Sequence, residues 1–320
     1  MNFHRAIRPL LILSSFFGFS VYFGENHHQS RLKRITIRGI LGKLPALAGI
    51  MLEIWTFKGC MSKSVGLLNI NRIVTTIIVI ALFLCNLLFN GNKISEALVV
   101  LAYTDDVIRK NITSNHLTHA TKRIKLKMAL FTAAAIIFTI WHGSLANISM
   151  GIDFCVVSHV IEVIISMIMG CVLVTLLEEV RIRIQAVNDG IEGILKGHET
   201  LELARSRLID CSNLHWRLCY VGRSIKRAFE MQILLKIIYA FFEIVFTLFY
   251  MIFTKKKTGF PKLLIYSVFL YHITVSFIQP AIILSSLLSV SKEANKTKDI
   301  LHSHRPQKPS IDHVVSIVLQ

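Results

Sequence analysis

The 320-residue chain is 53% hydrophobic and only 17% charged, whereas a soluble domain averages about 45–50% apolar and about 25% charged residues. It carries 36 lysines and arginines against 19 acidic residues, and its apolar residues fall in long runs without charge. Its six cysteines form neither a C-x-x-C pair nor a zinc-binding spacing, so a disulfide framework and a soluble cytosolic enzyme are both excluded. The composition predicts an all-α, polytopic membrane helix bundle.

Six stretches are apolar enough to cross a membrane, which takes about 20 residues each. In chain order they cover 39–57, 73–90, 128–148, 156–177, 231–254 and 263–290. The first is the weakest, because Lys43, Pro45 and Glu53 interrupt it. Before it, the short apolar core of Arg8–Gly24 has no clear cleavage site after it. This favours an interfacial or re-entrant helix over a cleaved signal peptide.

Basic residues orient the spans, since short loops rich in Lys and Arg stay in the cytoplasm. With the N-terminus inside, the cytoplasmic segments contain 26 of these residues and the outer loops contain 7. The one basic cluster that this orientation places outside is Lys255–Lys257. The spans then place both termini in the cytoplasm of a cell-membrane protein. The positive charge is explained by topology, and no nucleic-acid partner is expected.

The segment 179–230 is too long for a simple turn between two spans. Its apolar residues Ile182, Ile184, Val187 and Ile191 recur near helical spacing. We therefore expect a cytoplasmic helical extension of the spans on either side of it.

Polar side chains within membrane spans are costly and are functional candidates for that reason. In this orientation they gather from mid-depth, where Glu243 lies, into the outer halves of the third to sixth spans. The candidates are Trp141, His142, His159, Glu162, Glu243, Tyr271 and His272. A pocket with aromatic walls and a few polar anchors suits a small ligand. Alternatives stay open, because Trp141 equally suits an interfacial aromatic belt and Glu162 could pair structurally with His142 or His272.

No signature of catalysis or of metal binding stands out in the sequence. His198–Glu202 begins like a zinc-protease motif but ends in Glu instead of His, which favours a solvated helix. Neither a G-x-S-x-G motif nor a P-loop is present. We expect no enzyme activity, no cofactor and no metal. Gln279-Pro280 in the sixth span predicts a bend.

Several weak motifs occur in an order that is typical of one family. The chain opens with a Pro, an apolar run and a Gly in Arg8–Gly24. The other motif residues follow the fourth span, precede the fifth and follow the sixth, as Arg183, Val187, Asn188, Leu218, Phe229, Gln232, Leu234, Glu293, Ala294 and Thr297. In these residues and their order, the chain resembles the insect gustatory receptor family of seven-helix chemoreceptors.

The resemblance implies a function and an assembly. The chain is expected to be a subunit of a ligand-gated, non-selective cation channel that senses a small tastant, in a homo- or hetero-tetramer with related receptors. It also implies a seventh, pore-lining span that the chain, ending at Gln320, lacks. We therefore expect insertion into membranes without tastant-gated current. The alternative is a polytopic small-solute transporter that uses intramembrane Glu and His as a relay.

Overall fold

The computed structural model describes residues 67–89, 91–111, 154–197, 200–254 and 262–304, and six positions between 47 and 55. Every described residue is helical except Gly197 and Thr200. Over these residues the fold is therefore all-α, and the prediction of fold class from the composition is confirmed.

Five helices have defined bounds. They are α3 (Leu67–Phe89), α4 (Gly91–Asn111), α6 (Phe154–Lys196), α7 (Leu201–Thr254) and α8 (Lys262–His304). The three long ones contain 43, 54 and 43 residues, so at about 1.5 Å per residue α7 alone extends for roughly 80 Å. Since the hydrocarbon core of a bilayer is about 30 Å thick, each of the three is longer than one membrane crossing requires.

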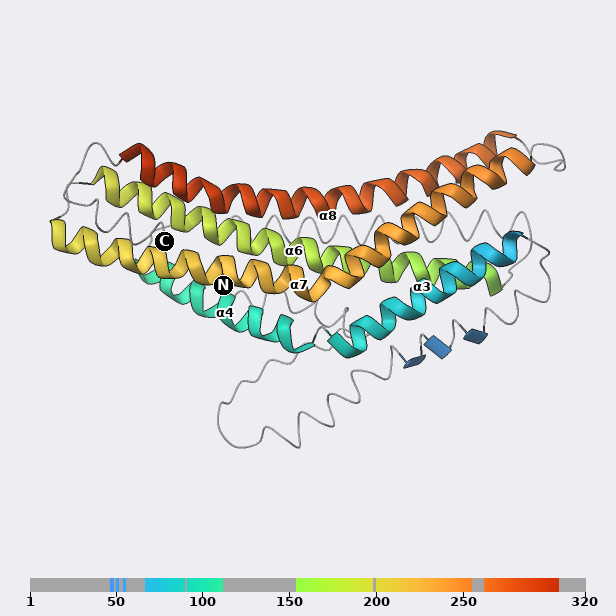
Figure 1. The fold of residues 1–320 in the computed structure, drawn as a ribbon, viewed down its shortest axis with the longest axis horizontal. Helices are drawn as coiled ribbons and strands as arrows, with labels where there is room; N and C mark the ends of the chain where they lie inside the picture. The colour runs from blue at the N-terminus through green and yellow to red at the C-terminus, as the bar shows by residue number, and fades with distance from the viewer. Residues whose placement is uncertain are drawn as a thin grey trace, which may run out of the picture.

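Helices α6, α7 and α8 form the centre of the protein. Each packs against the other two, while α3 and α4 pack against α7 (Figure 1). Helix α6 supplies more of the described core than any other helix, and its side chains Leu173, Leu176, Val180, Ile184 and Val187 are fully buried. The apolar positions that predicted a helix after residue 179 thus lie in α6.

A short break separates α6 from α7. Helix α6 closes with a hydrogen bond from the Gly197 amide to the Gly193 carbonyl, and α7 opens with one from the Ala204 amide to the Thr200 carbonyl, both 3.0 Å long. Glycine is common just after a helix and threonine just before one, and Glu202 adds the negative charge that suits a first turn. The rest of the predicted zinc-protease-like motif, His198 and Glu199, lies outside the described residues.

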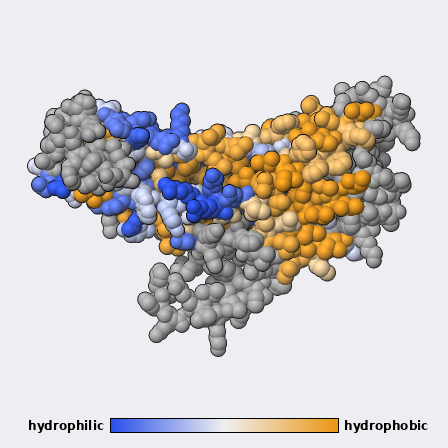
Figure 2. All heavy atoms as spheres, in the orientation of Figure 1, coloured by the Kyte–Doolittle hydropathy of each residue, from blue (hydrophilic) through white to orange (hydrophobic). Residues whose placement is uncertain are grey.

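The molecule has two chemically different halves. Figure 2 shows hydrophobic surface over the end that contains α3 and hydrophilic surface over the opposite end. We call the first the apolar half (α3, 154–177, 231–254 and 262–290) and the second the polar half (α4, 178–197, 200–230 and 291–304). Among the described residues, one stretch, Glu202–Phe249, contains a window long and apolar enough to cross a membrane, and only 28% of that window is buried.

The predicted spans map onto these helices as follows. The second lies in α3 up to Phe89, the fourth in α6, the fifth in α7 and the sixth in α8, which continues as a helix through Pro280. The first is described only at six helical positions, and the third, 128–148, lies outside the described residues.

Candidate functional site

The predicted pocket residues are distributed over three described helices and one undescribed segment. His159 and Glu162 belong to α6, Glu243 to α7, and Tyr271 and His272 to α8. Trp141 and His142 lie outside the described residues, and Glu243 is the one predicted site residue whose side chain the structure describes.

One contact fixes the register of the three long helices in the apolar half. The Lys236 ammonium donates a 3.0 Å hydrogen bond to Oε1 of Gln279, which joins α7 to α8. A Cβ atom placed on Gly170 of α6 would lie 3.2 Å from Nζ of Lys236. These three residues therefore share one level, where glycine leaves room for the end of the lysine side chain.

The register also sets the depth of the predicted site residues along the helices. Counting from Gly170, Lys236 and Gln279 at about 1.5 Å per residue, Glu162, Glu243 and Tyr271 each lie roughly 10–12 Å further into the apolar half. Three positions that are 81 and 28 residues apart in the chain are thus at similar depth on adjacent helices.

Glu243 is part of a buried polar line along one face of α7. Its members Gln232, Lys236, Glu243 and Thr247 follow one another at spacings of four, seven and four residues and have exposed fractions of 0%, 3%, 8% and 8%. Such spacings keep side chains on one helix face. Charged groups in an apolar environment need partners and usually mark a functional path, so this line is the candidate site in the apolar half.

Two glycines of α6, Gly170 and Gly193, give a test of the Lys236 contact. Alanine at Gly193 meets nothing within 4 Å, so G193A should stabilise the protein by about 0.5–1 kcal/mol through helix propensity. G170A should gain less or lose stability, because its methyl group would displace the ammonium of Lys236. Melting temperatures in detergent measure both. Equal stabilisation by the two substitutions would contradict the close approach of α6 to Lys236.

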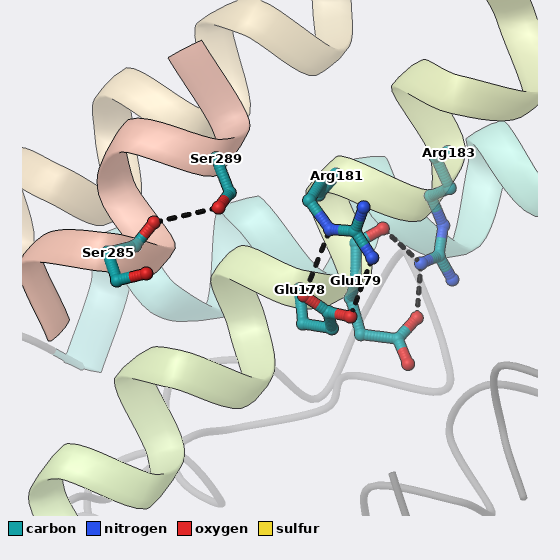
Figure 3. Close-up of polar contacts among 6 residues, drawn as sticks. All are labelled: Glu178, Glu179, Arg181, Arg183, Ser285 and Ser289. Carbon is teal, nitrogen blue, oxygen red and sulfur yellow. Dashed lines mark hydrogen bonds and ion pairs between the residues drawn. The ribbon is translucent and has the colours of Figure 1, made fainter. Parts of the chain in front are cut away.

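In the polar half, a second polar cluster joins α4 to α6. The guanidinium of Arg183 is 1% exposed and forms a 2.8 Å ion pair with Asp105 of α4. It also pairs with Glu179, one turn earlier in α6, as Figure 3 shows. Its Nη1 also donates a 2.8 Å hydrogen bond to the Glu179 carbonyl. Burial raises the pKa of Glu179 above its ordinary value, and Arg183 offsets part of that shift.

A third cluster joins α6 to α8. The amide nitrogen of Asn188, a fully buried residue, donates to the Glu293 carbonyl at 3.0 Å and to its carboxylate at 3.1 Å. The Thr297 hydroxyl, also buried, donates a 2.6 Å hydrogen bond to Oδ1 of Asn188. One asparagine side chain thus holds two successive turns of α8 against α6.

These clusters contain residues that the sequence marked through the resemblance and others that it did not. Arg183, Asn188, Glu293 and Thr297 were motif residues, and they prove to be buried partners. Asp105 was not singled out, because α4 lies outside the predicted spans and contains other charged residues, such as Glu96 and Asp106, from which the sequence does not distinguish it.

The comparisons with known proteins agree with this architecture. Residues 7–312 match the family model described as 7tm Chemosensory receptor. The chain belongs to that family.

Among solved structures, this chemosensory receptor is similar to the insect olfactory receptor OR5 from Machilis hrabei. The match has a TM-score of 0.65 and covers 98% of this chain and 88% of that chain, at 11% sequence identity. At that identity the likeness concerns the fold alone. No curated protein matches the receptor. The predicted resemblance to insect chemoreceptors is confirmed at the level of the chemosensory receptor family.

The described part of the receptor contains two cysteines in its polar half, Cys211 and Cys219, both as free thiols. Within the described part, no three His, Cys, Asp or Glu side chains are grouped so as to hold a metal ion. In the polar half, burial raises the pKa of Cys211 to about 11 and also raises that of Cys219. These two cysteines are therefore neutral at physiological pH.

Proposed function

We propose that this chemosensory receptor is a gustatory receptor: a subunit of a ligand-gated, non-selective cation channel that senses a small tastant without chemical change to it. The observation that carries the proposal is a buried polar line with an acidic group, Glu243, in the apolar half of a protein of this family. The gustatory assignment rests on the motif residues Arg183, Asn188, Glu293 and Thr297, and the homo- or hetero-tetrameric assembly rests on the family resemblance.

The proposed topology has about six spans in the cell membrane and both termini of this chain in the cytoplasm. The distribution of 26 against 7 basic residues supports it. In this arrangement the polar half, with its extension 179–230, is cytoplasmic. The exposed apolar side chains of α3, α7 and α8 that lie in the apolar half then face lipid.

The proposed tastant site lies in the outer part of the apolar half. It comprises the residues predicted from the sequence, Trp141, His142, His159, Glu162, Glu243, Tyr271 and His272. The similar depths of Glu162, Glu243 and Tyr271 on adjacent helices support this grouping, as does the burial of the Glu243 side chain.

The substitution E243Q tests this function. A hydrogen bond to a charged group contributes about 1.5–3 kcal/mol, so loss of the charge should raise the tastant concentration for half-maximal response by about 10- to 100-fold. The measurement is cation current or calcium entry in cells that express the receptor fused to a seventh span from a related receptor, under a panel of sugars, bitter compounds and volatile odorants. Responses to soluble tastants, and not to volatiles, are expected.

The matched control is V245A, because Val245 is two residues away on α7 and 43% exposed. It should leave the dose–response within about twofold, and both variants should reach the surface at the level of the unmodified receptor. Unchanged responses in E243Q would contradict a ligand role for Glu243. Responses confined to volatile odorants would replace the gustatory assignment with an olfactory one.

The alternative function is small-solute transport. Lys236 and Glu243, two ionisable residues buried in the apolar half, are the observation that favours it, since such residues also form proton or substrate relays. Uptake of a labelled solute into proteoliposomes without ligand-gated current would support the transporter instead of the channel.

A further inference from the structure

The exposed face of α7 changes its chemistry abruptly along the helix. Arg223, Lys226 and Arg227 are exposed, and we call these three residues the cationic edge. After Glu230, which is also exposed, the exposed residues of α7 as far as Phe241 are large and apolar, with exposed fractions of 55%, 49% and 62% for Met231, Leu234 and Phe241. Because the spacings are three, four and seven residues, Arg227, Met231, Leu234 and Phe241 lie on one helix face.

The cationic edge lies where all three long helices pass from one half to the other. A Cβ atom on Gly222 would lie 3.6 Å from Val180 of α6 and 3.7 Å from Val290 of α8, so these residues share one level. The predicted apolar runs of α6 and α8 end close to it, at 177 and 290. Figure 2 shows hydrophilic surface in the middle of the molecule, directly beside the hydrophobic half.

The distances suit a lipid headgroup. Along α7, Arg227, Lys226 and Arg223 precede Met231 by roughly 6, 7.5 and 12 Å at about 1.5 Å per residue. The headgroup layer of one leaflet is about 5–7 Å thick, and long basic side chains extend several ångströms toward it.

The charge of the cationic edge is unbalanced locally. The stretch Arg217–Glu230 contains four basic residues and one acid. Within the part of the chain that the structure describes, Arg223, Lys226 and Arg227 form no ion pair, whereas Arg181 at a similar level on α6 is paired with Glu178 at 2.8 Å. Three exposed cations beside an apolar face therefore suit an anion that also has an apolar part.

We propose that the cationic edge binds the headgroup of an anionic phospholipid whose acyl chains lie along Met231, Leu234 and Phe241. Clusters of basic residues just outside a membrane helix attract anionic lipids of the cytoplasmic leaflet. A second copy of the chain on this same face would bring like charges together. The inference rests on the proposed function only in taking the polar half as cytoplasmic.

The test compares two double variants of the purified full chain that lose the same charge. K226Q/R227Q removes two members of the cationic edge, and R205Q/K298Q removes two exposed cations elsewhere in the polar half. Affinity for phosphatidylinositol 4,5-bisphosphate is measured in phosphatidylcholine nanodiscs, by thermal stabilisation over a lipid titration. We expect K226Q/R227Q to bind about 30-fold more weakly and the control to stay within about threefold.

Further arms identify the source of the anion and the nature of the surface. Phosphatidylserine should also stabilise the protein, whereas soluble inositol trisphosphate and inorganic phosphate should not, because they lack acyl chains. Equal lipid affinity of the two double variants would overturn the proposal. So would a change of oligomeric state in K226Q/R227Q with lipid affinity intact, which would assign the face to a protein partner. Since no tastant is used, this outcome is independent of the Glu243 experiment.

Discussion

Replacing Arg183 with methionine is expected to destabilise the protein by about 3–5 kcal/mol, the largest stability loss of any substitution considered. Arg183 is almost completely buried between Asp105 and Glu179, and methionine would leave both carboxylates without their cation. Because Arg183 joins the two helices through Asp105, its loss should allow α4 to separate from α6. The measurements are the melting temperature in detergent and the fraction of protein that elutes as a single species.

The control lies two residues away in the same helix. Arg181 pairs with Glu178, but its side chain is 28% exposed, so R181M should cost no more than about 1 kcal/mol (Figure 3). The combination D105N/E179Q/R183M removes the unpaired charges and should recover much of the lost stability. Equal losses in R181M and R183M would contradict the view that burial, and not pairing alone, makes Arg183 important.

The second large effect is expected at Asn188. In N188L, the Thr297 hydroxyl loses its acceptor, and the Glu293 carboxylate and carbonyl lose a donor. Leaving a buried polar group unpaired costs about 1–3 kcal/mol, so a loss of about 2–4 kcal/mol is expected for the set. T297V, which removes one hydrogen bond from the same cluster, should cost about 1 kcal/mol.

A double-mutant cycle separates this cluster from general damage to packing. If Asn188 and Thr297 act together, N188L/T297V should cost clearly less than the sum of the two single substitutions. Additive losses would show that the two residues stabilise the α6–α8 contact independently.

The fold class could be predicted from the sequence because long apolar runs and helical periodicity are local properties. The buried positions Ile184, Val187 and Ile191 of α6 follow the 3.6-residue repeat of apolar residues that is visible in the sequence. The family could be predicted for a different reason. Burying Arg183 or Asn188 costs free energy unless its polar groups have partners. A sequence motif that includes these residues therefore indicates contacts that hold the helices together.

The partners of these residues could not be predicted. The Asn188–Glu293 contact joins positions 105 residues apart, and it depends on how α6 and α8 are shifted and rotated relative to each other. The same holds for Lys236 and Gln279, 43 residues apart, of which the sequence analysis marked only Gln279, as the start of a bend. Sequence periodicity defines faces, but register between helices arises only from three-dimensional packing.

The continuity of α7 has a mechanical consequence. From Lys236, which is bonded to α8, α7 extends for about 27 Å to Thr254 and about 52 Å to Leu201. If α7 turned rigidly about this contact, a sideways shift of 1 Å at the Thr254 end would become about 2 Å at Leu201. Because no loop interrupts α7, a displacement of its Thr254 end is carried along the helix to the end that lies in the polar half.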